Sequence, residues 1–197
     1  VRPEQMPYKN PMAQLYDSGQ FEHVMDQGLA LADWNGFEAR EAESRGRGKW
    51  RGLGIATFLE WTSGNVFEER VTVTVLADRT IEVFSAVNGM GQGIATSLAQ
   101  LVVDVFDVPM ERIRIVLGDT DRGEGFGSAG SRSAFVGGSA VKVGSQRTIE
   151  HARGMAAAKL EADAKDIDYR AGRFAVRGTD LGIDLFELAA EQEGRRI

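Results

Sequence analysis

The hydrophobic period of this chain changes twice between residues 71 and 117, and this change limits its fold more than any other feature. Residues 71–77 and 80–86 are β-branched and apolar around a short turn, which predicts a hairpin. The period then becomes helical, with apolar side chains on one face at Ile94, Leu98, Leu101, Val102 and Val105. Residues 113–117 alternate as a strand again. A strand, a helix and a strand in this order predict a crossover unit, whose ligand loops lie at the carboxyl ends of the strands.

Helices and a second hairpin are expected to flank this unit. Residues 133–160 predict a long helix of small side chains, whose glycines permit the close approach of a neighbouring element. Each glycine costs about 1 kcal/mol against alanine, so tight packing must offset it. Residues 167–176 predict a hairpin, and Asp184 with Glu187 predicts a capped start of a last helix. The expected fold class is α+β, with a mixed β-sheet and flanking helices.

The chain is expected to divide into three parts of one incomplete domain. Residues 1–50 form a helical entry segment. Its apolar side chains recur at helical spacing at Phe21, Val24, Met25, Leu29 and Ala32. Residues 51–165 form an α/β core that carries two glycine-rich loops, with a further strand over residues 53–62. Residues 166–197 form the second hairpin and the C-terminal helix. Because the first residue is not Met, a segment of a longer protein is expected.

Composition excludes several classes of function. The formal net charge of -6 provides no broad basic field, which argues against binding to nucleic acid or to an anionic membrane surface. The absence of cysteine excludes disulfides, zinc–thiolate sites, iron–sulfur clusters held by this chain and a thiol nucleophile. The chain has no apolar run of about 18 residues and no secretion signal. A soluble, cytoplasmic protein is therefore expected.

The first glycine-rich loop spans residues 88–93 and directly precedes the helix that starts at Ile94. Its glycines allow a sharp turn, and free N–H groups at a helix start attract anionic oxygen. The Gln92 amide both donates and accepts, so it suits a carbonyl, a pterin edge or a metal oxo group. Thr96 adds a hydroxyl about one turn into the helix. The loop lacks the Gly-Lys-Ser/Thr ending of a phosphate loop and the acidic residue of a Rossmann turn, so ATP and NAD are disfavoured.

The second glycine-rich loop spans residues 118–133 and ends where the long helix begins. It holds five glycines, three serines and Arg132, which together offer backbone, hydroxyl and charge-assisted donors to a phosphate. A flexible surface loop is the alternative, but loops of this length inside compact domains are more often functional. The acidic residues Asp119, Asp121 and Glu124 do not have the spacing of a calcium loop.

Four short blocks resemble a known family by their order and spacing. They are Gly91-Gln92-Gly93 with Thr96 and Gln100, Gly118-Asp119-Thr120, Gly130-Ser131-Arg132-Ser133, and Gly137-Gly138-Ser139-Ala140. Together they resemble the molybdenum-binding large subunit of the xanthine dehydrogenase, aldehyde oxidase and carbon monoxide dehydrogenase family. The similarity runs through most of the chain, and it implies a fold of the molybdenum-cofactor-binding domain type.

The resemblance implies that the ligand is molybdopterin, often as its cytosine dinucleotide in bacteria. Gln92 would lie near the molybdenum oxo ligand without binding the metal directly, and Gly93 would follow it along the cofactor. The second loop would hold pterin phosphate or the nucleotide end. The cofactor-binding residues implied by the matching motifs are Gly91, Gln92, Gly93, Thr96, Ser128, Gly130, Ser131, Arg132 and Ser133.

The resemblance also implies what this chain lacks. Family members hydroxylate a carbon centre with oxygen from water, and a glutamate in a late Gly-x-Gly-Glu motif activates the metal-bound hydroxide. That motif does not follow the cofactor loops here, since Gly123-Glu124 lies within the second loop. The upstream loops that complete the metal pocket are also absent. The expected function is therefore that of a cofactor-binding segment of an oxidoreductase, without catalytic residues of its own and inactive alone.

Partners follow from the same resemblance. Family members pass electrons to iron–sulfur and FAD subunits or domains, and the absence of cysteine agrees with clusters held elsewhere. The other expected partners are the remainder of the large subunit and a small-molecule substrate. Purines, N-heterocycles, aldehydes and carbon monoxide all stay open as substrates. Two other interpretations also stay open: a non-catalytic nucleotide- or phosphate-binding module, and an interaction subunit whose long helix packs on a partner.

Overall fold

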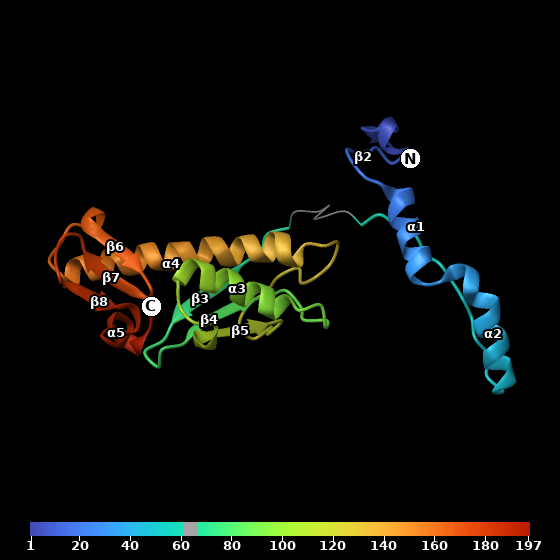
Figure 1. Cartoon of the computed structure of the whole chain (residues 1–197). Coiled ribbons are helices and arrows are strands. Elements are labelled where there is room, and N and C mark those ends of the chain that lie inside the picture. Colours follow the sequence, from blue (N-terminus) through green and yellow to red (C-terminus); the bar gives the residue numbers. More distant parts are fainter. Residues whose placement is uncertain (61–66) are drawn as a thin grey trace. The chain divides into compact units, whose positions relative to one another are not determined.

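The computed structural model describes residues 1–60 and 67–197. The chain divides into two compact units, Val1–Leu59 and Glu60–Ile197. Both glycine-rich loops and the long helix belong to the second unit (Figure 1).

The first unit consists of short elements with little buried surface. Strands β1, Tyr8–Lys9, and β2, Leu15–Tyr16, pair antiparallel. Helices α1, Phe21–Leu31, and α2, Phe37–Gly46, confirm the helices predicted in this part of the chain. Short 3-10 turns lie at Pro3–Gln5 and Trp34–Gly36. Among residues 1–59, Ser44 is the one buried residue, so this unit has no apolar core of its own.

The strand predicted over residues 53–62 is wrong where the structure describes it. Residues 53–60 lie outside any helix or strand, and apolar side chains such as Leu53, Ile55 and Phe58 are exposed. A strand needs a neighbour for its backbone hydrogen bonds, and residues 53–60 make no such bond to the described residues. Residues 61 and 62 lie outside the described part of the chain.

The central sheet of the second unit has the strand order β3-β4-β5 and is mixed, as predicted. Strand β3, Val71–Val75, pairs antiparallel with β4, Ile81–Ser85, and β4 pairs parallel with β5, Ile113–Leu117. Helix α3, Ile94–Phe106, connects the two parallel strands. The α+β class and the crossover unit are therefore confirmed.

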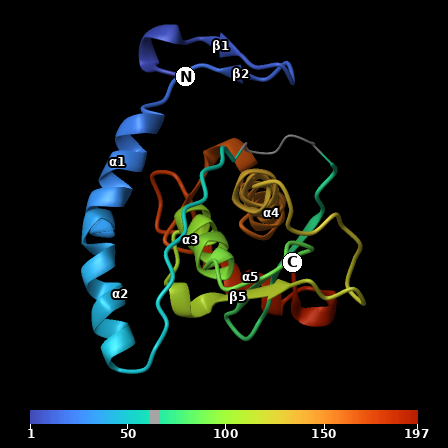
Figure 2. The same ribbon diagram turned by 90° about the vertical axis from the view of Figure 1, so that its right-hand side faces the viewer.

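Two helices pack on this sheet. Helix α3 contacts β5, and helix α4, Gly138–Lys159, contacts β3 and α3. Figure 2, in which α4 is seen end-on, shows α3 beside it and β5 below α3. Val83 of β4, Leu98 of α3 and Val141 of α4 are fully buried in one apolar cluster. No helix in the described part of the chain has the length and apolar character needed to cross a membrane.

Glycines bring α4 and the single π-helical turn before it, Ser133–Gly137, close to their neighbours, as the sequence predicts. A Cβ atom on Gly137 would lie 2.8 Å from Cγ1 of Val87. A Cβ atom on Gly144 would lie 2.9 Å from Cγ2 of Val71 and 3.3 Å from Cγ2 of Val73. These separations are shorter than ordinary carbon–carbon contacts, so a larger residue would push α4 away from β3.

A three-stranded antiparallel sheet and a short helix complete the second unit. They are β6, Ile167–Arg170, β7, Arg173–Val176, β8, Gly182–Asp184, and α5, Leu185–Ala190. Short 3-10 turns lie at Met110–Arg112, Ala164–Asp166 and Glu193–Arg195. The predicted helix cap is confirmed, because the Asp184 carboxylate accepts from Phe186 N at 2.8 Å and Glu187 N at 3.3 Å. Phe174 and Leu185 belong to the same apolar cluster as the central sheet.

Replacing Gly144 by alanine should destabilise the protein relative to a matched change on the same helix. The new methyl group would meet two valines with stiff side chains, and overpacking of this kind costs about 1–3 kcal/mol. At Gly154 a Cβ atom has nothing within 4 Å. Gly154→Ala should therefore raise the free energy of unfolding by about 0.5–1 kcal/mol through helix propensity. Urea unfolding of both variants measures the difference, and equal stabilisation by both would contradict the close packing of α4 on β3.

Candidate functional site

The two glycine-rich loops lie at the same end of the central sheet. The first, residues 88–93, lies shortly after the end of β4, and the second, residues 118–133, directly follows β5. Because β4 and β5 are parallel, their carboxyl ends meet at one edge, and hydrogen bonds join the two loops there. Helix α3 and the helix that begins at Ser133 both start at this end (Figure 1). The structure therefore brings together the two segments that the sequence analysis singled out.

Neither helix start is capped by a side chain within the described residues. Gly93 precedes α3 and Arg132 precedes the helix that begins at Ser133, and neither makes a side-chain hydrogen bond to the first turn. The first N–H groups of a helix have no partner inside it, and they carry a partial positive charge. Two such helix starts at one sheet edge can hold anionic oxygens, above all those of phosphate.

The second loop turns sharply just before its helix. Gly130 and Ser131 both have a φ of 56°, in the left-handed region. A serine there is conformationally strained, and strain of this kind concentrates at functional sites. Gly130 and Ser131, which form this turn, are exposed. Arg132 after them is buried, and Ser133 is half-buried. The Ser131 hydroxyl donates to Oε1 of Glu60 at 2.8 Å.

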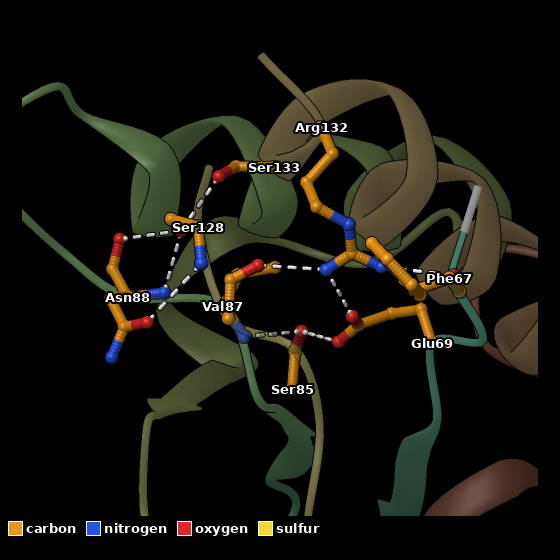
Figure 3. Close-up of polar contacts among 9 residues, drawn as sticks. Phe67, Glu69, Ser85, Val87, Asn88, Ser128, Arg132 and Ser133 are labelled. Atoms are coloured by element: carbon orange, nitrogen blue, oxygen red, sulfur yellow. Dashed lines mark hydrogen bonds and ion pairs between the residues drawn. The ribbon is translucent and has the colours of Figure 1, made fainter. Parts of the chain in front are cut away.

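Asn88 and Ser128 join the two loops. Asn88 N donates to the Ser128 hydroxyl at 2.8 Å, and that hydroxyl donates back to Asn88 O at 3.2 Å. Ser128 N donates to Oδ1 of Asn88 at 3.3 Å, and the Ser133 hydroxyl donates to the Ser128 hydroxyl at 2.6 Å (Figure 3). The Ser128 hydroxyl therefore uses its one proton and two acceptor positions inside the protein.

The Gln92 side chain braces the first loop. Its Oε1 accepts from Met90 N at 2.6 Å, and its Nε2 donates to Asn88 O at 2.9 Å. An amide can donate twice and accept twice, so one N–H group and one lone pair remain for a ligand. The predicted neighbours Gly91, Gly93 and Thr96 are exposed around it. The placement of Gln92 beside a molybdenum oxo group stays a prediction.

The Arg132 side chain turns inward and is held by three acceptors. Its Nη1 donates to Oε2 of Glu69 at 2.8 Å and to Gly127 O at 2.7 Å, and its Nη2 donates to Phe67 O at 3.1 Å (Figure 3). The side chains of Arg132 and Glu69 are both 1% exposed. Removing one partner of a buried ion pair costs about 3–5 kcal/mol, more than the about 1.5–3 kcal/mol that a charged hydrogen bond contributes. The guanidinium is therefore better satisfied inside the loop than at its surface.

Sequence reasoning missed Glu69 and the role of Asn88. Glu69 lies just before Val71, at which β3 begins, where a charged residue ordinarily faces water, and its partner Arg132 is 63 residues away. No local period links such residues. Asn88 stands at the start of the first loop, and an asparagine at a turn is a recognisable signal for backbone hydrogen bonds.

A polar cleft of about 690 Å³, which residues 122–125 of the second loop line together with β3 and β4, is a weaker candidate. Its charged lining residues are Glu68, Arg70, Arg122 and Glu124. Arg122 pairs with Glu82 at 2.5 Å and Arg70 with Glu68 at 2.9 Å. The hydrogen bond from Arg70 holds the pKa of the exposed Glu68 carboxyl below its usual value. Because these cations are paired, the cleft offers an anion fewer free positive groups than the two helix starts do.

The chain is similar to known proteins over most of its length. Residues 27–196 match the family model of the molybdopterin cofactor-binding domain. The nicotine 6-hydroxylase large subunit of Paenarthrobacter nicotinovorans is 32% identical over 187 residues, which cover 88% of this chain and 23% of that protein. Reconstituted CO dehydrogenase from Oligotropha carboxidovorans aligns with a TM-score of 0.62 at 27% identity, over 96% of this chain and 26% of that chain. Quinoline 2-oxidoreductase from Pseudomonas putida 86 aligns with a TM-score of 0.58 at 30% identity, over 95% of this chain and 25% of that chain.

These matches confirm the resemblance carried by the four motif blocks. The chain spans about a quarter of the length of the relatives it matches. The matched region includes both glycine-rich loops and the helices that start from them. The chain therefore belongs to the molybdopterin cofactor-binding domain family, and it is similar to a segment of the large subunit of its nicotine 6-hydroxylase relative.

Proposed function

We propose that the two loops hold the phosphate-bearing end of a molybdopterin cofactor in a molybdenum hydroxylase. The observation that carries this proposal is the meeting of two uncapped helix starts at one sheet edge, beside exposed glycine-rich loops. Backbone N–H groups at such an edge bind phosphate without a free cation. The proposal includes the cytosine dinucleotide form of the cofactor, whose additional phosphate the second loop would hold.

The residues of the loops fit such a group in different ways. Gly91, Gly93 and Gly130 would bind it through exposed backbone, and the Thr96 hydroxyl would donate to phosphate. The Ser131 and Ser133 hydroxyls would donate to phosphate in exchange for their bonds to Glu60 and Ser128. Gln92 would face the molybdenum oxo ligand with the N–H group that its loop leaves unused. Ser128 and Arg132 would keep the loops in place, because the Ser128 hydroxyl and both Nη atoms of Arg132 are already bonded inside the protein.

When bound, the cofactor supplies the hydroxylation of a substrate carbon with oxygen from water. The residues of this chain bind and orient it. Because no Gly-x-Gly-Glu motif follows the loops, we propose that this segment does not turn over substrate alone and that the remainder of the large subunit completes the pocket. The nicotine enzyme of the comparison is named as a large subunit. We further propose that the complete enzyme passes electrons to iron–sulfur and FAD subunits or domains. It would act on a small-molecule substrate and lie in the cytoplasm.

The substitution Thr96→Glu should remove the cofactor and keep the fold. Thr96 is exposed in the first turn of α3, where a negative charge stabilises a helix by about 0.3–1 kcal/mol. The same charge within about 5 Å of a phosphate costs about 3 kcal/mol at an effective dielectric constant near 20, so occupancy should fall at least tenfold. The measurement is the molybdenum and pterin content of the natural polypeptide that contains this chain, purified from a host that supplies the cofactor.

Gln146→Glu is the matched control. Gln146 is exposed on α4, so the substitution adds the same charge away from the loops. The cofactor content of this variant should equal that of the parent protein. A parent protein that contains neither molybdenum nor pterin would overturn the proposed function. Full occupancy in Thr96→Glu would instead overturn the assignment of the α3 start to the site.

The link between the loops gives a second prediction. Ser128→Ala removes three hydrogen bonds and Asn88→Ala removes one, so Ser128→Ala should lower the free energy of unfolding more. Each net hydrogen bond contributes about 0.5–1.5 kcal/mol, reduced here because water replaces part of the exposed bonds. The double variant should lose less than the sum of the single variants, because both changes remove one shared network. Urea unfolding of the two single variants and the double variant tests this prediction, with Ser18→Ala on the exposed first unit as control. If the losses of unfolding free energy were strictly additive, the two side chains would not act as one shared network.

A further inference from the structure

We infer that Glu69 is a positioning residue for the second loop, and that it acts through Arg132, which does not itself touch the bound phosphate. The inference rests on the proposed function, because it names how the proposed phosphate-binding loop is held. It also changes the role that the sequence motif assigns to Arg132, from a ligand contact to an internal anchor.

The Glu69 carboxylate lies at the centre of contacts among three segments. Its Oε2 accepts from Nη1 of Arg132 at 2.8 Å, and its Oε1 accepts from the Ser85 hydroxyl at 3.2 Å. Ser85 is the last residue of β4, and Arg132 ends the second loop. Figure 3 shows the carboxylate between these two side chains. Glu69 therefore ties the segment before β3 to the end of β4 and to the second loop.

The planar guanidinium of Arg132 extends this tie to backbone atoms. It donates to Gly127 O at 2.7 Å, in the second loop, and to Phe67 O at 3.1 Å, in the segment that carries Glu69. The Phe126 ring stacks on Phe67 with ring centres 4.3 Å apart, and the guanidinium carbon lies 5.3 Å from the centre of the Phe126 ring. Because the guanidinium is planar and rigid and binds two carbonyls and a carboxylate, it sets the distance between the second loop and the segment before β3.

A direct contact between Arg132 and a phosphate would break this arrangement. To reach the exposed face of the loop, the guanidinium would have to leave Glu69, which is 1% exposed, as an unpaired buried charge. The cost of that buried charge exceeds the gain from a charged hydrogen bond to the ligand. Arg132 therefore stays inside when the ligand binds.

The anchored residue controls the backbone that faces the ligand. Arg132 directly follows the strained Ser131 and directly precedes Ser133, where the helix begins. Holding its side chain inward fixes the left-handed turn, in which Gly130 and Ser131 are exposed. Without the anchor, the turn would relax and the N–H groups would lose their common direction, because strained backbone persists only where its surroundings hold it.

The test uses Glu69→Gln and Arg132→Lys in the natural polypeptide that contains this chain, with molybdenum and pterin content as the readout. If Glu69 positions the loop, Glu69→Gln should lower the cofactor content about tenfold, although Arg132 keeps its charge. If Arg132 binds phosphate directly, the same substitution frees it and the content should stay constant or rise. Arg132→Lys keeps the charge but cannot span the same acceptors, so positioning predicts a similar loss. Parental content in both variants would overturn the inference.

A stability control separates positioning from general destabilisation. Leu188→Ala opens a cavity in the buried core at α5, at the other end of the second unit from the loops (Figure 1), and should lower the unfolding midpoint at least as much as Glu69→Gln does. Below both midpoints it should keep the parental cofactor content within about twofold, whereas Glu69→Gln should not. Equal losses in the two variants would reduce Glu69 to a structural residue. A cofactor-free parent protein would contradict the proposed function itself, which keeps the two failures apart.

Hydrogen exchange gives a readout that needs no cofactor. In the cofactor-free protein, the amides of residues 127–133 should exchange at least tenfold faster in Glu69→Gln than in the parent, while those of α4 beyond its first turns keep their rates. If Glu69→Gln folds poorly, the exchange rates of residues 127–133 and of α4 can be compared in Arg132→Lys instead. Unchanged exchange of residues 127–133 in both variants would overturn the positioning role.

Discussion

The parallel pairing of β4 with β5 is the constraint on which the rest of the second unit depends. Two parallel strands cannot be joined by a tight turn, so the chain must cross over, and α3 makes that connection. The crossing places the carboxyl ends of both strands and the start of α3 at one edge, and the second loop brings the start of the long helix to the same edge. The place of the site therefore follows from strand direction rather than from any single side chain.

Features set by neighbouring residues were predictable from the sequence. The strand predicted over residues 113–117 coincides with β5, and α3 begins at Ile94, where the apolar period begins. The Asp184 cap was visible because a cap needs only residues within one turn. The glycines of the long helix indicated close packing because an unpacked glycine destabilises a helix. Strand β8, with three residues, was missed because so short a strand has no period of its own.

Features set by distant residues were not predictable. Residues 53–60 have the composition of a strand, yet no described strand pairs with them, because composition does not supply a neighbour. Arg132 carries the same chemistry whether it binds a phosphate or an internal carboxylate. Only the tertiary position of Glu69, 63 residues away in the sequence, decides between these roles. The loops could thus be located from their glycines and serines, whereas the direction of their one buried cation could not.

The proposed attraction of this site for an anion would arise without a free cation in either loop. The cations of the loops are Arg122, which pairs with Glu82 and Asp119, and Arg132, which pairs with Glu69. The formal net charge is -6, but charges beyond about 10 Å are largely screened at 0.1 M salt. Within that distance the two helix starts contribute partial positive charge, whose effect falls off within the first turn, and Glu60, bonded to Ser131, contributes a carboxylate. The direction of a few N–H groups therefore matters more to binding than the charge balance, and a neutral buried pair that fixes this direction contributes more than an exposed cation would.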